Sequence, residues 1–352
     1  MLFRPLLAPA LALLIALAAA PLQAQTPAAP EGAPLDIDHP DKLQGLKRVV
    51  IPSFNVHFVT QSRAGVPING VQVLTGAPSN VTITLKGADP ARFQALADAL
   101  YDQTVQRLQA VGIEVVPLAT LQAQPAFAEI VQKADPGPKA EDAAAGQGVF
   151  HAARGLPLYH MDEVSFIQKF EIKLFGGKKP EDTFLPLSSR LAAGFSHGFI
   201  AQAEQRLAQA LDAAVLKVRL TVTAGTLDVA TNFWTGQEIS TRAAATMSPL
   251  VNRFAFILPD GGKARLALKQ PVTSGEIGEL ANVTSTTSQA ADVARNVLNV
   301  AMILGGARTN MGYGRSADYE WRVTPEVYEQ GVSAQAAQLV AQLVTQVQAL
   351  RP

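Results

Sequence analysis

Three carboxylates and one imidazole lie close together near the amino terminus, at Asp36, Asp38, His39 and Asp41. Closely spaced oxygen ligands are typical of Ca²⁺ sites, and an imidazole beside them would also suit a transition metal. A solvated segment leading into a strand, with Asp38 or Asp41 as a cap or turn residue, explains the same residues. We keep these four residues as candidate metal ligands, and whether a metal binds stays open.

A second group of residues with acid–base or metal-binding chemistry is His151, His160, Asp162 and Glu163. Such residues can supply a general base or metal ligands. The two imidazoles are nine residues apart, a spacing that fixes no geometry between them. We therefore favour surface or structural histidines here over a catalytic pair.

Two glycine-rich segments, residues 176–179 and 305–315, combine backbone amides with a cationic side chain and could meet an anion. The second follows an expected helix and precedes an expected strand, whereas phosphate loops lie between a strand and a helix amino terminus. A helix C-cap with a flexible connection is the better interpretation. The neighbouring apolar stretch, residues 297–304, is typical of a core-facing helix, with docking to a partner as the alternative.

The motifs that identify several enzyme classes are missing. The chain has no Gly-x-Ser-x-Gly elbow, no phosphate-loop motif, no His-Glu-x-x-His helix and no EF-hand loop. We predict no catalytic residue and no cofactor. Scattered constellations leave no local motif, so whether the protein is an enzyme stays open, with a non-catalytic role preferred.

The amino terminus has the pattern of a secretory signal. Arg4 precedes an apolar run over residues 6–20, and Ala24 provides a small residue for cleavage. We expect residues 1–24 to be a signal peptide and the mature protein to be periplasmic or secreted, without a transmembrane anchor after cleavage. No cysteine occurs in the chain, which excludes disulfides and lipidation of a terminal cysteine.

Charge and composition exclude one class of partner. Lysine and arginine together equal aspartate and glutamate, so the formal net charge is zero. Nucleic-acid binding normally needs a basic excess or a basic stripe, and neither is present. The apolar, alanine-rich composition is that of a well-buried globular protein.

Hydrophobic periodicity predicts alternating strands and helices. Strands are expected at residues 47–60, bent near Pro52, and at 80–86, 113–116, 214–224 and 317–323, and a hairpin is expected around the Pro-Asp-Gly-Gly turn at 259–262. Helices are expected at residues 89–111, 118–133, 199–211 and 288–304 and at the carboxyl terminus. This alternation predicts an α+β or α/β fold with a mixed, partly antiparallel sheet and flanking helices.

The predicted domain boundaries follow composition. Residues 25–45 are expected to be a linker, and 46–133 an α/β region. A proline- and glycine-rich stretch at 134–148 is expected to be a linker or mobile loop. Residues 149–352 are expected to form an α/β region that continues the same domain or forms a second one.

The succession of the strand at 48–60, the helix at 90–111, the Val-Gly-Ile-Glu-Val-Val return and the later helix running into residues 215–223 resembles two envelope families. These are the curli-secretion CsgG-like family and the TolB amino-terminal domain family. The resemblance covers about half of the chain and rests on pattern, so no functional residue is transferred. It implies an envelope α/β protein that binds or assembles with other macromolecules.

Two functions remain open at this stage. The first is an exported, non-catalytic envelope protein that acts as an interaction or assembly module with another envelope protein. The alternative is a periplasmic ligand-binding protein or a hydrolase with a scattered active site. Polar groups that converge in a closed pocket would favour the alternative, and an exposed interaction surface would favour the first.

Overall fold

The computed structural model describes residues 35–65, 78–135, 137–143, 146–159, 200–223, 225–232, 236–242, 246–247, 252–268, 272–273, 275–286 and 315–351. Residues from Gly32 onward form one compact unit. Within the described ranges, the first half of the chain contributes β1 (Leu35–Asp38), η1 (Pro40–Leu43), β2 (Arg48–Gly65), β3 (Pro78–Lys86), η2 (Pro90–Arg92), α2 (Phe93–Ala110), β4 (Glu114–Val115), α3 (Leu118–Gln122), α4 (Pro125–Lys133), β5 (Lys139–Ala143) and β6 (Gly146–Ala152).

The second half contributes a helix over residues 200–211, the remaining strands and the carboxyl-terminal helix. These elements are β7 (Ala214–Thr223), β8 (Thr226–Asn232), β9 (Gly236–Arg242), β10 (Thr246–Met247), β11 (Arg253–Ile257), β12 (Lys263–Leu268), β13 (Val272–Thr273), β14 (Glu279–Asn282), β15 (Arg315–Arg322) and α8 (Pro325–Ala349).

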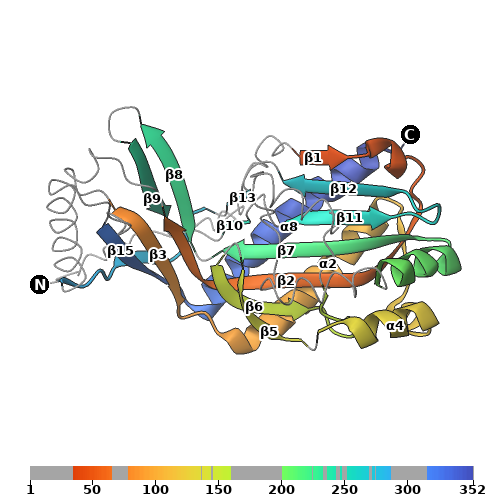
Figure 1. Cartoon of the computed structure of the whole chain (residues 1–352), viewed down its shortest axis with the longest axis horizontal. Helices are drawn as coiled ribbons and strands as arrows, with labels where there is room; N and C mark the ends of the chain where they lie inside the picture. Colours follow the sequence, from red (N-terminus) through yellow and green to blue (C-terminus); the bar gives the residue numbers. More distant parts are fainter. Residues whose placement is uncertain are drawn as a thin grey trace, which may run out of the picture. The chain divides into compact units, whose positions relative to one another are not determined.

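One large mixed sheet organises these elements (Figure 1). The strand order is β1-β12-β11-β7-β2-β3-β15-β14, with β4, β5, β6, β10 and β13 attached beside this path. The long β2 runs parallel to β7 and antiparallel to β3 and β6. The predicted fold class, with its mixed and partly antiparallel sheet and flanking helices, is confirmed.

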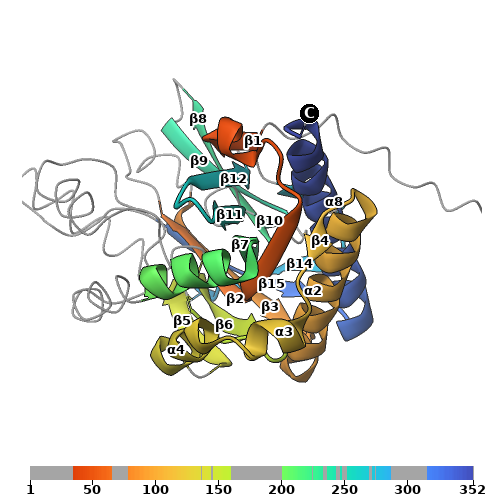
Figure 2. The ribbon, with the colours of Figure 1, turned by 90° about the vertical axis from the view of Figure 1, so that its right-hand side faces the viewer.

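Helices cover both faces of the sheet (Figure 2). On one face, α2 and α8 pack on the larger core through fully buried residues such as Leu100, Leu339 and Leu343. On the other face, α4 and the helix over residues 200–211 pack on a smaller core around Val50 and Val215. Strand β7 is therefore apolar on both sides at its start, as expected of a central strand between two layers.

A register shift in β2 explains how its apolar residues serve two cores. The pairing with β7 is irregular between Val50 and Ser53, at the position of Ile51 and Pro52. Proline has no N–H to donate to a ladder, so it favours such an irregularity. The predicted bend near Pro52 is confirmed. Its consequence is that Val50 joins the smaller core, whereas Phe54 joins the larger one.

Side-chain caps mark the starts of the two long helices, and the one at Asp89 agrees with the helix expected over residues 89–111. The Asp89 side chain accepts from the Ala91 N–H at 3.0 Å, and Pro90 occupies the first turn before α2. Thr324 caps α8 in the same way by accepting from the Val327 N–H. Apolar periodicity in the carboxyl-terminal helix predicts one buried side, and six of its seven residues are buried while Leu350, just beyond α8, is partly buried: Val332, Ala336, Leu339, Val340, Leu343 and Val347.

The predicted helix over residues 118–133 is wrong as a single element. The structure divides it into α3 and α4, with Gln124 in extended conformation between them. Pro125 causes the break, because the residue before a proline is pushed out of the α region. Pro125 then starts α4 at a position that tolerates it.

Two segments expected to be linkers contain regular structure. Within residues 25–45, β1 pairs antiparallel with β12, and Leu43 of η1 is fully buried. Within residues 134–148, β5 and the start of β6 form a hairpin beside β2. Pairing with strands distant in sequence stabilises both segments, and their own composition carries no sign of it.

Several predicted elements lie outside the described residues. These include the helix at 288–304, the glycine-rich segments apart from Arg315, and His160, Asp162 and Glu163. Among the residues that are described, no helix is both long enough and apolar enough to cross a membrane.

Candidate functional site

The four candidate metal ligands near the amino terminus do not converge. Asp36 and Asp38 alternate along β1, and both lie within 4 Å of the Arg265 guanidinium on the paired strand β12. His39 follows with a left-handed backbone, and Asp41 lies in the first turn of η1. The described part of the chain contains no group of three or more His, Cys, Asp or Glu residues placed to hold a metal ion.

His151 belongs to a chain of polar side chains that joins β6 to α2. Its Nδ1 lies 3.1 Å from the Gln94 Oε1, and the Gln94 amide donates to both the Asp98 carboxylate and the Ala152 carbonyl. Asp98 in turn accepts from the Arg154 backbone N–H at 2.8 Å. Partial burial lowers the pKa of His151, and the nearby Asp98 opposes this shift.

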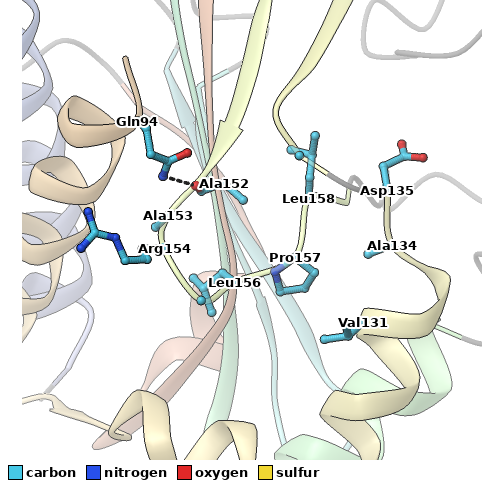
Figure 3. A pocket seen from close by; sticks show the side chains of 12 residues that line it. Gln94, Val131, Ala134, Asp135, Ala152, Ala153, Arg154, Leu156, Pro157 and Leu158 are labelled. Carbon is cyan, nitrogen blue, oxygen red and sulfur yellow. Dashed lines mark hydrogen bonds between the residues drawn. The ribbon is translucent and has the colours of Figure 1, made fainter. Parts of the chain in front are cut away.

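A hollow of about 530 Å³ lies beside this chain (Figure 3). The turn that follows β6 forms one wall, and the end of α4 with the residues after it forms the opposite wall. Most of its lining is apolar or backbone, and the polar side chains on it are those of Gln94, Asp135 and Arg154.

The charges around the hollow are already engaged. The Arg154 guanidinium lies 2.9 Å from the Asp98 carboxylate, and in Figure 3 it points toward α2, away from the hollow. Asp135 on the opposite wall pairs with Lys139 at 2.8 Å. No base or nucleophile among the lining side chains points into the hollow. The hollow could therefore fit a ligand by its shape, but it presents no catalytic group.

A layer of buried polar residues lies on the face of the sheet opposite the larger core. These residues were not identified as a group from the sequence. Cross-strand pairing aligns Arg253 of β11, Arg219 of β7 and Asn55 of β2 in one row. The next row contains Thr221 of β7 and His57 of β2. All five side chains are buried. Their neighbours along each strand belong to the larger core on the opposite face, so the strand period places the polar residues on this one.

A buried ion pair lies at one end of this layer. Glu204, on the helix over residues 200–211, is fully buried and accepts from Lys217 Nζ at 3.3 Å. It also accepts from the Tyr159 hydroxyl at 2.9 Å. Burial and then the Glu204 charge raise the pKa of that hydroxyl well above its ordinary value. The Tyr159 carbonyl accepts from the Asn55 amide at 2.6 Å, which ties the network to β2.

His57 is the most isolated member of the layer. Its side chain is fully buried and its ring stacks on Phe150 of β6, with centroids 3.8 Å apart and an interplanar angle of 12°. Neither ring nitrogen has a hydrogen-bond partner among the described residues. Burial, and then the charge of Arg219, lower the pKa of His57 to about 3, so the imidazole is neutral near pH 7.

The sequence does carry a sign of this polar layer. In the segment Lys217–Thr221 the charged and hydroxyl residues alternate with Val218 and Leu220, and in β2 the residues Ser53, Asn55 and His57 alternate with aromatic and aliphatic neighbours. Alternation of this kind normally indicates a solvated second face. Only the tertiary structure shows that this face is covered.

Comparison of the chain with family models, with curated proteins and with solved structures finds no match.

Proposed function

We propose that this protein is exported to the cell envelope and acts there, without catalysis, by assembling with another envelope protein. The observation that carries the proposal is the ribbon of β8 and β9, which forms a two-stranded sheet of its own (Figure 1). Within the described part of the chain, each of these two strands pairs only with the other.

A two-stranded ribbon of this kind gains little stability from its own strand pairing. Two strands alone are marginally stable in water, and each presents one edge of unpaired backbone N–H and C=O groups. Adding a strand from another chain satisfies these groups and is a common mode of protein recognition. The ribbon therefore supports an assembly role better than the hollow supports an enzymatic one, because the charged groups on the hollow are already paired.

The export part of the proposal rests on the amino-terminal sequence and has a direct test. The full-length chain is expressed in a bacterium, and the protein in the periplasmic fraction is analysed by intact mass and amino-terminal sequencing. We expect a mature chain that begins at Gln25. A protein that keeps residues 1–24, or that stays in the cytoplasm, contradicts the proposal.

The assembly part is tested with a ribbon variant in which residues 226–242 are replaced by a short Gly/Ser linker. Light scattering and cross-linking with mass spectrometry are applied to the mature protein in periplasmic extract. We expect the variant to lose the assembled species and its cross-links while keeping most of its thermal stability, because no described strand of the main sheet pairs with the ribbon. Assembly that persists in the variant contradicts this role.

A ligand-binding protein is the second candidate function, and the hollow beside Gln94 and Arg154 is the observation that favours it. The control variant Val131→Asp places a charge on its lining at a side chain that is 48% exposed. If Val131→Asp abolishes binding of a co-purifying small molecule and the ribbon variant does not, the ligand-binding function replaces the assembly function.

A further inference from the structure

The contact between His57 and Phe150 lies where the β5–β6 hairpin is attached to the sheet. β6 pairs antiparallel with β2 from Asn55 to Gln61, and β5 pairs only with β6. In this register His57 faces Phe150 directly across the two strands. The hairpin is thus a peripheral pair of strands whose described backbone pairing to the rest of the sheet is with one stretch of β2, and Gln94 of α2 contacts its end at His151 and Ala152.

The surroundings of His57 accept the imidazole only in its neutral form. The ring stacks on Phe150 of β6, and a Cβ added at Gly148 would lie 2.7 Å from its Nε2, so the packing is tight. In the part of the chain that the structure describes, neither ring nitrogen has a hydrogen-bond partner, and a charge buried without a partner is costly.

Among the described residues, the charged group that acts most directly on the ring is the Arg219 guanidinium, which lowers the pKa of His57. Arg219 is the next residue along β7 on the same face, with Arg253 beside it in the same row, and Lys217 is already paired with Glu204. On β5, the register places Lys139 opposite Phe150 and Glu141 opposite Gly148, and Lys139 is paired with Asp135. An imidazolium at this position would therefore be repelled by Arg219 and would lack a described partner.

We propose that His57 is an acid-sensitive contact that holds the β5–β6 hairpin on β2, and that its protonation releases the hairpin and exposes the β2 edge at residues 55–61. Strand β2 would keep its pairing with β7 on the other side, so the sheet itself would persist. An exposed backbone edge is a site for strand addition, and acid would thus create a second pairing surface. This inference does not depend on the proposed function.

The sign of the pH effect follows from linkage. The pKa of His57 in the closed state is about 3, below the ordinary histidine value of 6.5. The open state therefore binds more protons between these two values, and the closed state is fully favoured only above about pH 6.5. As the pH falls, the opening equilibrium constant rises about tenfold per pH unit, which gives about 100-fold at pH 4.5 relative to neutral pH.

The experiment is hydrogen exchange with mass spectrometry on the mature protein between pH 7 and pH 4.5, with protection factors corrected for intrinsic exchange. We expect residues 147–151 to lose protection by up to about 100-fold, while residues 215–222 of β7 keep theirs. His57→Phe preserves an aromatic stack but cannot be protonated, and it should make the protection of the hairpin independent of pH. If His57→Phe does not fold, His57→Gln serves the same purpose.

His151→Gln is the matched control, because His151 lies on the same hairpin but faces Phe58 and Phe93 on the opposite side of the sheet. It should retain the acid response of the wild type. Two results would overturn the inference: loss of protection in the hairpin and in β7 together, or an acid response that survives substitution of His57.

Discussion

The Arg351 guanidinium, just beyond α8, donates to the Val111 backbone carbonyl at the end of α2 over 2.8 Å. At the opposite ends of the same helices, Arg92 contacts Glu326 and Glu329. The two helices therefore run parallel, although more than two hundred residues separate them in the chain. Arg351 places a positive charge at the carboxyl terminus of α2, where the helix dipole is negative.

Arg351→Ala should destabilise the protein by about 1 kcal/mol, because the α2 carbonyls lose a charged donor. Urea unfolding followed by circular dichroism measures this change. Arg322→Ala is the control, since Arg322 is paired only with Glu320 on its own strand and is half exposed; it should cost less. Equal effects of the two substitutions would argue against a capping role for Arg351.

Glu204→Ala should be among the most damaging substitutions in the chain. It leaves the Lys217 ammonium, which is 11% exposed, without its carboxylate, and it removes the acceptor of the Tyr159 hydroxyl. Breaking a buried pair in this way costs about 3 to 5 kcal/mol.

Replacing both partners of that pair provides the control. Glu204→Gln with Lys217→Met retains an acceptor for Tyr159 and removes both charges, so it should recover most of the loss in urea unfolding at neutral pH. If the double variant is as unstable as Glu204→Ala, the cost comes from packing and not from the unpaired charge.

Gly87→Ala should prevent the close approach of the end of β3 to Val323, the residue that follows β15. Gly87 has a φ of +88°, and an added Cβ would lie 2.0 Å from the Val323 carbonyl oxygen. Gly45 has a similar φ of +75° but open space around it, so Gly45→Ala isolates the conformational cost of about 1 kcal/mol.

Thermal unfolding of these two glycine variants separates the cost of the positive φ from the cost of the steric clash. Gly87→Ala should lose at least about 1 kcal/mol more than Gly45→Ala, because backbone atoms must move to relieve the clash. Similar melting temperatures for the two variants would show that the close approach is easily relaxed.

Metal ions should have no effect on stability through the amino-terminal aspartates. Asp36 and Asp38 are paired with Arg265 at half-exposed positions, so Asp38→Ala should cost less than about 1 kcal/mol. We expect the same melting temperature with millimolar Ca²⁺, with Zn²⁺ and with a chelator. A rise with metal that disappears in Asp38→Ala with His39→Ala would restore the metal site.

Local sequence patterns were sufficient for the long helices, for strands such as β2, β3, β7 and β15, and for the β11–β12 hairpin. The Pro-Asp-Gly-Gly turn predicted the β11–β12 hairpin, and Gly261 has the positive φ that the turn requires. Asp89 and Pro90 predicted the start of the long helix. These predictions succeed because a cap or a tight turn involves residues only a few positions apart. Pro125 shows the limit, since the apolar period on both sides of it suggested one helix where the structure has two.

The sequence by itself determined the period of the long helices and of strands such as β7, and so which of their residues share a face. Only the tertiary structure decided what each face meets. β1 is a strand because β12 lies beside it, and the polar face of β2 and β7 is buried because other parts of the chain cover it. Periodicity depends on neighbours along the chain, whereas pairing and burial also depend on partners far away in the sequence, such as Phe150 for His57 and Arg265 for Asp38. For that reason Asp38 meets Arg265, and His57 lies neutral against Phe150, as no local pattern could have shown.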